Sequence, residues 1–105
     1  MPKVYIINKG GHNHHDAERF GELVFLSQGT VNRYAVSQMY RQFVEQLKDS
    51  SEDDYILQTG LSVMASVACS IFARIHGRLN LLLFKTQSGE EGRYVERTIM
   101  IDELL

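Results

Sequence analysis

The chain has 105 residues, of which 44% are hydrophobic and 23% charged. These values are typical of one soluble globular domain spanning residues 1–105, and they exclude a largely disordered chain. The formal net charge of -2, with eleven Lys and Arg residues scattered singly, argues against nucleic acid or an anionic membrane as a partner.

The first half of the chain predicts two short strands and one helix. β-forming residues at Lys3–Ile7 are followed by a polar loop, Ala17–Phe20 allows one helical turn, and Leu23–Leu26 is a second strand. A helix is expected from Arg33 to Lys48, with Asn32 as its N-cap. Apolar residues at spacings of three and four give this helix a single stripe facing the core.

The second half predicts a strand, a helix and a hairpin. The acidic segment Asp49–Asp54 is expected to be a solvated connection to the strand Tyr55–Leu57. The predicted helix Leu61–His76 is apolar on most sides, which indicates that it is covered on most sides, partly by a second subunit. Glycine at position 77 suits a left-handed C-cap. A strand is predicted at Leu79–Lys85, a turn at Ser88–Gly92 and a final strand at Arg93–Ile101.

The element order is therefore β-β-α-β-α-β-β, which predicts an α/β fold. Strand–helix–strand units join parallel strands, and the almost continuously apolar segment Leu79–Lys85 is typical of a strand buried on both faces. We expect one compact sheet, mostly parallel and Rossmann-like, with an antiparallel C-terminal hairpin.

The single cysteine and the start of the sequence indicate the compartment. Cys69 has no partner for an internal disulfide and lies in the apolar segment Leu61–Ile75, where a buried thiol is expected. Met1-Pro2-Lys3 leads directly into a strand, without the pattern of a signal peptide. The apolar segment is interrupted by serines and Arg74 and is too short to span a bilayer. A cytoplasmic protein is expected.

The turn between the third predicted strand and the second helix is the first candidate site. Ligands of open α/β sheets collect at strand carboxyl ends, and free N–H groups at a helix N-terminus hold anions such as phosphate. Gly60, Leu61 and Ser62 would offer N–H groups, and Thr59 a hydroxyl. The segment lacks the lysine and spacing of a P-loop, so an ordinary capped helix start is the alternative.

The loop after the first strand is the second candidate. His12, His14 and Asp16 could ligate a metal ion, but a polar, flexible loop that covers the same pocket is favoured, and no cofactor is predicted. Asn8, Gly11 and His12 would then contact the ligand. If the second strand lies beside the first, Arg33 and Tyr34 reach the same rim, where Arg33 could pair with a phosphate and Tyr34 could stack on a base, or both could be surface neighbours of the N-cap.

Four segments resemble small accessory proteins of tailed bacteriophages: Lys3–Gly11, Phe20–Ser27, Met39–Phe43 and Asp53–Phe84. The resemblance implies an intracellular protein that acts on the host, in the host cytoplasm. Some small phage proteins of this kind form oligomers that sequester nucleotide immune signals.

These observations together predict a non-enzymatic homo-oligomer, associated through the helix near Leu61–His76, that binds a small phosphorylated ligand such as a nucleotide or cyclic nucleotide. Two other classes stay open. One is a phosphodiesterase or ring nuclease, either with a metal held by the histidine loop or with His12 as acid and base. The other is an inhibitor whose apolar second helix binds a host protein.

Overall fold

The protein is described from a computed structural model, which covers residues 2–10, 13–59 and 62–104. The side chains of residues 62, 87 and 90 are outside this description. Five strands form one sheet in the order β2-β1-β3-β4-β5. Their bounds are Lys3–Ile6 (β1), Glu22–Phe25 (β2), Tyr55–Leu57 (β3), Leu79–Gln87 (β4) and Glu90–Ile99 (β5).

The predicted fold class is confirmed. β1 pairs in parallel with β2 and β3, β3 pairs in parallel with β4, and β4 and β5 form an antiparallel hairpin. The helices are α1 (Val36–Leu47), α2 (Ser62–His76), the short 3-10 helix η1 (His15–Arg19) and a C-terminal turn of helix, α3 (Ile101–Leu104). Sequence analysis predicted neither α3 nor the full length of β5.

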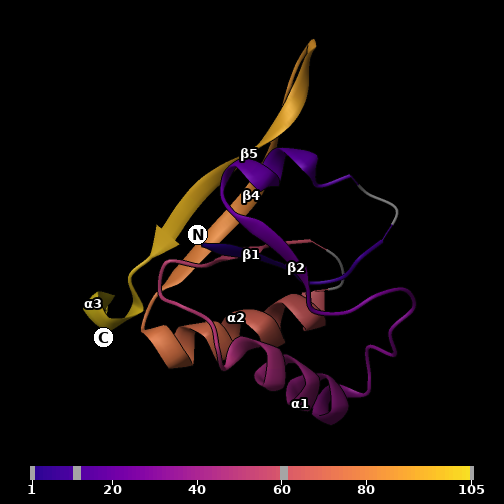
Figure 1. Cartoon of the computed structure of the whole chain (residues 1–105), viewed down its shortest axis with the longest axis vertical. Helices are drawn as coiled ribbons and strands as arrows, with labels where there is room; N and C mark the ends of the chain where they lie inside the picture. Colours follow the sequence, from indigo (N-terminus) through magenta and orange to yellow (C-terminus); the bar gives the residue numbers. More distant parts are fainter. Residues whose placement is uncertain (1, 11–12, 60–61, 105) are drawn as a thin grey trace.

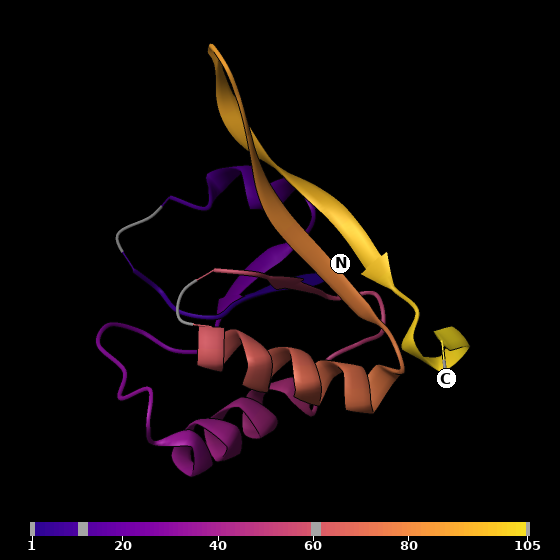
Figure 2. The same ribbon diagram turned by 180° about the vertical axis from the view of Figure 1, so that it is seen from behind.

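Alternating side chains divide the core between the two faces of the sheet. Tyr5 and Ile56 point toward α1 and α2 and belong to the larger apolar cluster. Val4, Ile6 and Leu57 point the other way and pack with Ala17 of η1. Figures 1 and 2 show α1 and α2 side by side beneath one face of the sheet, with η1 on the opposite side. Because both faces are covered, the inner strands read as continuous apolar runs.

The β4–β5 hairpin extends beyond the rest of the sheet. β3 pairs with β4 at Leu81 and Leu82, and no other strand of the described residues lies beside the distal half of the hairpin. Both ribbon views show it projecting as an arm (Figures 1 and 2). The turn at its tip is Ser88–Gly89, shorter than the predicted Ser88–Gly92, because Gly89 adopts a φ of 78°.

Two helix ends test the predicted caps. α1 begins at Val36 rather than Arg33, because the Asn32 carboxamide accepts the N–H of Tyr34 at 3.0 Å and forms a local turn instead of an N-cap. Gly77 has a φ of 69°, and its N–H donates to the carbonyl of Ala73, so it ends α2 as predicted. In the ranges that the structure covers, each helix is too short or too polar to cross a bilayer.

The connection before β3 is not uniformly solvated, which corrects one prediction. Asp53 is exposed, but the Asp54 side chain is only 3% exposed. Its carboxylate accepts the Lys3 N–H at 2.9 Å and the Ser51 N–H at 2.8 Å. Asp54 therefore joins the start of β1 to the start of β3.

Candidate functional site

A cavity of about 240 Å³ lies at the carboxyl end of β3. Gln58 and Thr59, which directly follow that strand, form one side of it. The other sides come from the loop before η1 and from the hairpin, and the lining residues of those sides are Asn13, His14, Phe84 and Tyr94. Ligands of open α/β sheets bind at this edge.

Two aromatic rings from the hairpin form a wall of the cavity. Phe84 and Tyr94 face each other across β4 and β5, with ring centroids 5.1 Å apart and an angle of 64° between planes. Gly92 makes this possible, because a Cβ at that position would lie 2.2 Å from Cζ of Phe84. Phe84 keeps 53% of its surface exposed, so its ring is open to contact with a flat ligand.

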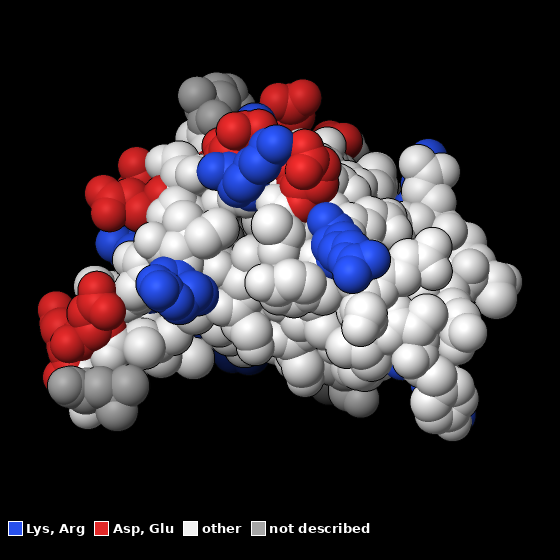
Figure 3. All heavy atoms as spheres, turned by 90° about the horizontal axis from the view of Figure 1, so that it is seen from below, with Lys and Arg blue, Asp and Glu red and all other residues white. Residues whose placement is uncertain are grey.

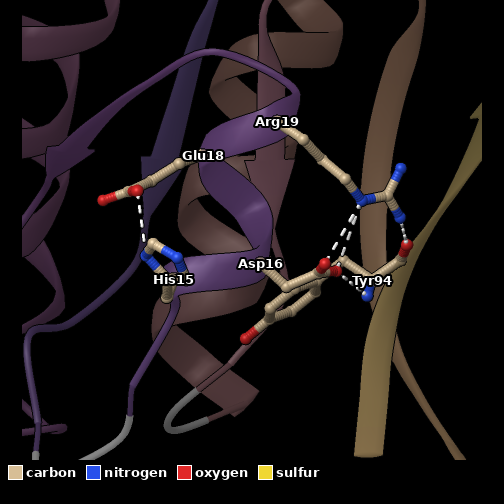
Figure 4. Close-up of polar contacts among 5 residues, drawn as sticks. All are labelled: His15, Asp16, Glu18, Arg19 and Tyr94. Atoms are coloured by element: carbon tan, nitrogen blue, oxygen red, sulfur yellow. Dashed lines mark hydrogen bonds and ion pairs between the residues drawn. The ribbon is translucent and has the colours of Figure 1, made fainter.

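Tyr94 is fixed in place by η1. The hydroxyl of Tyr94 lies 2.9 Å from Nδ1 of His14, and the backbone N–H of Tyr94 donates to Asp16 Oδ2 at 2.7 Å. Arg19 Nη2 donates to the Tyr94 carbonyl, and Arg19 Nε also lies 3.3 Å from Asp16 Oδ1. Figure 4 shows Asp16 and Arg19 reaching the strand together, while His15 and Glu18 pair away from it. The wall is therefore held by contacts to the main chain as well as to the ring.

These contacts shift two pKa values. The Tyr94 N–H, followed by the Arg19 cation, lowers the pKa of Asp16, while partial burial opposes that shift. Burial raises the pKa of the Tyr94 hydroxyl, and the Asp16 carboxylate adds to that rise.

The depressed pKa of Asp16 predicts a loss of stability in acid. A carboxyl whose pKa is lower in the folded state stabilises the fold above its unfolded pKa, and this contribution is lost as the pH falls through the folded pKa. Asp16→Asn should therefore be less stable than the wild type at pH 7, and the difference should narrow toward acid. Urea unfolding at a series of pH values measures this, and a difference independent of pH would contradict it.

The structure places the predicted site residues in different parts of the molecule. Thr59 lines the cavity, and Ser62 is the first residue of α2. The Asn8 carboxamide instead bridges two strand ends, donating to the Gly29 carbonyl and accepting from the Ser27 hydroxyl. Arg33 is exposed and contacts the ring of its neighbour Tyr34, away from the cavity lining. The other four predicted residues lie outside the described ranges: Gly11, His12, Gly60 and Leu61.

The described part of the histidine loop is not wholly exposed. His14 is buried and its Nδ1 lies within hydrogen-bond distance of the Tyr94 hydroxyl, so at this position the loop packs against the hairpin. Asp16 is engaged by Tyr94 and Arg19. Within residues 2–10, 13–59 and 62–104, no three His, Cys, Asp or Glu side chains gather in a way that could hold a metal ion. The candidate ligand His12 is outside those ranges.

Sequence reasoning missed the two lining residues of the hairpin, Phe84 and Tyr94. Phe84 and Tyr94 belong to a hairpin whose cross-strand register is visible only once β5 is known to start at Glu90. Gly92 was the available signal once β5 is known to include it, because a glycine inside a strand marks a close approach of another group.

These features define a small α/β protein with one mixed sheet and a partly aromatic cavity at the carboxyl edge of its parallel strands. The chain belongs to the phage Pam3 gp32-like protein family, whose model matches residues 2–101. This confirms the resemblance to phage proteins. No curated protein and no solved structure matched the chain.

Proposed function

We propose that the protein binds, without turning it over, a small phosphorylated ligand that contains a flat ring, such as a nucleotide or cyclic nucleotide. The observation that supports this is the cavity beside Thr59, which combines an exposed aromatic ring with amide and hydroxyl groups. Cavities of this kind are mainly apolar, with a few polar groups that fix the ligand's orientation.

The size of the cavity suits part of a nucleotide. A volume of about 240 Å³ is somewhat below the roughly 300 to 1,000 Å³ of sites that enclose a drug-sized ligand. A base with part of its sugar would occupy the cavity, and phosphates would extend out of it. α2 begins at Ser62, three residues after Thr59. Because the N-terminal end of a helix dipole favours an anion, we expect the phosphates to extend toward that end of α2.

Different lining groups would recognise the flat face of the base and its hydrogen-bonding edge. Phe84 would stack on the base, and such stacking contributes about 1 to 3 kcal/mol per base. The Gln58 and Asn13 carboxamides can both donate and accept hydrogen bonds, and Thr59 adds a hydroxyl. Lys and Arg are absent from the lining that the structure describes, so the ring should supply most of the affinity and salt should weaken binding little.

Membership of a phage family supports a role inside the infected host cell. A non-enzymatic binder of a signalling nucleotide would lower the free concentration of that signal. We therefore propose sequestration, as a counter-defence function in the host cytoplasm, for this member of the family.

The test begins with mass spectrometry of small molecules released from the purified, folded protein. Isothermal titration calorimetry with a panel of linear and cyclic nucleotides follows. Phe84→Leu, which keeps an apolar side chain but removes the ring, is expected to weaken binding by about tenfold to a hundredfold.

The matched control is Tyr34→Leu, which removes an exposed aromatic ring outside the cavity lining and should leave the affinity unchanged. Thr59→Val is expected to weaken binding and Thr30→Val, at an exposed threonine elsewhere, is not. Absence of binding across the panel, or equal affinities for Phe84→Leu and the wild type, would reject the proposal.

A further inference from the structure

The outward side of α2 has few charges for a surface helix. Arg74 is the only Asp, Glu, Lys or Arg in the fifteen-residue segment Ser62–His76. The neighbouring α1 carries Arg41 and Glu45 on its exposed side, as expected for a helix facing water. The buried side of α2 packs on the sheet through residues such as Met64, Ala68 and Phe72. Its outer side thus resembles a covered surface rather than a solvated one.

An apolar groove of about 440 Å³ runs between the two helices. Val36, Tyr40 and Val44 of α1 line one side, and Val67 and Ile75 of α2 are among the residues that line the other. Tyr40 is 55% exposed, and Val36 and Ile75 are also exposed. Figure 3 shows this side of the molecule, where acidic side chains gather toward the margins and the middle is mostly uncharged, broken by basic side chains.

The end of the molecule that carries α1 and α2 has room for a standard interface. The molecule measures 41 × 36 × 25 Å, and the view onto α1 and α2 is along its longest axis. The outline in that view fits within a rectangle of 36 × 25 Å, or about 900 Å², and stable complexes bury about 800 Å² per partner. A second copy seated on this end therefore has the area that a stable dimer needs.

We infer that this α1–α2 face is a homodimer interface, covered by the same face of a second copy of the chain. Interfaces between identical subunits are more apolar and poorer in charge than those with transient partners. Among the described residues that line the groove, the charged one is Arg74, so they offer no mixed pattern of charges to select a foreign protein. Small side chains at Ser66 and Ser70, on the outer side of α2, allow another helix to approach closely.

The described linings of the groove and of the ligand cavity have no residue in common, so the two proposals can fail separately. Sedimentation velocity of the full chain across a range of concentrations should find a species of twice the 12.0 kDa chain mass. A wild-type protein that stays monomeric at about 100 µM, where even weak dimers associate, would overturn the inference.

Val36→Glu is the sharpest variant. The first turn of α1 contains no acidic residue, and a carboxylate at a helix N-terminus favours the helix, so the monomer should fold normally. The same carboxylate would be buried without a partner in the dimer, which should weaken association by more than about 100-fold. Ile75→Glu places a charge on the groove from α2 and should act in the same way.

The matched control is Leu104→Glu, at a residue that is 72% exposed and does not line the groove. It should leave the dimer intact, and circular dichroism should confirm that each variant is folded. If Val36→Glu fails to fold, the near-isosteric Val36→Thr must still weaken the dimer by about tenfold. Dimers that survive the groove substitutions, or that dissociate with Leu104→Glu, would overturn the inference.

Discussion

Replacing Asp54 with alanine is expected to lower the free energy of unfolding by about 3 kcal/mol. The carboxylate accepts the N–H groups of Lys3 and Ser51, and both bonds are at least partly shielded from water. Hydrogen bonds to a charged group each contribute about 1.5 to 3 kcal/mol, and the variant would also leave two partly shielded N–H groups without their acceptor. For a domain of this size the melting temperature should fall by roughly 10 to 20 °C.

Asp53→Ala is the matched control, because it removes the same group one residue earlier at an exposed position. Its effect should stay within about 0.5 kcal/mol. Urea unfolding of the three proteins at pH 7 gives the comparison. Equal stabilities for the two variants would mean that the Asp54 contacts do not hold the ends of β1 and β3 together.

The contrast between these two aspartates explains where sequence reasoning stops. Both lie in one acidic segment, and no local pattern distinguishes them. Asp54 is buried because its carboxylate reaches Lys3, which is 51 residues away along the chain. Such a contact depends on the pairing of β1 with β3, which only the folded sheet provides.

The same reasoning applies to the candidate site. The sequence predicted a ligand position beyond the third strand, and the structure places a cavity beside Thr59 there. It did not predict the opposite wall, because the bond from His14 to Tyr94 spans 80 residues. The predicted turn at residues 60 and 61, between the third strand and the second helix, lies outside the described ranges and stays a prediction.

Local signals were reliable where the core itself determines the pattern. β1, β3 and the middle of β4, at Leu81 and Leu82, are apolar on both faces because helices and η1 cover both sides of the sheet. The start of α1 was wrong by three residues because Asn32 has two alternative uses, as a helix cap or in a local turn, and both satisfy a backbone N–H. Fold class therefore follows from periodicity, while caps and long-range polar contacts do not.

Gly21→Ala is expected to destabilise the protein by about 3 kcal/mol, at the upper end of the cost of overpacking. Gly21 connects η1 to β2, and a Cβ there would lie 2.2 Å from the carbonyl oxygen of Pro2. That oxygen accepts the N–H of Glu22 at 3.1 Å, so the main chains of both strands would have to move apart. A main-chain clash cannot be relieved by rotating a side chain, and the shift would also displace η1, which holds Tyr94 at the cavity.

Gly10→Ala provides the comparison, because a Cβ at Gly10 has no neighbour within 4 Å in the described structure and its φ is not positive. This substitution should be neutral or stabilise by about 0.4 to 1 kcal/mol through the unfolded chain. Thermal and urea unfolding of both variants would measure the difference. If Gly21→Ala were as stable as Gly10→Ala, the main chain at Gly21 would not lie against Pro2 as described, and the position of η1 beside Tyr94 would not depend on that contact.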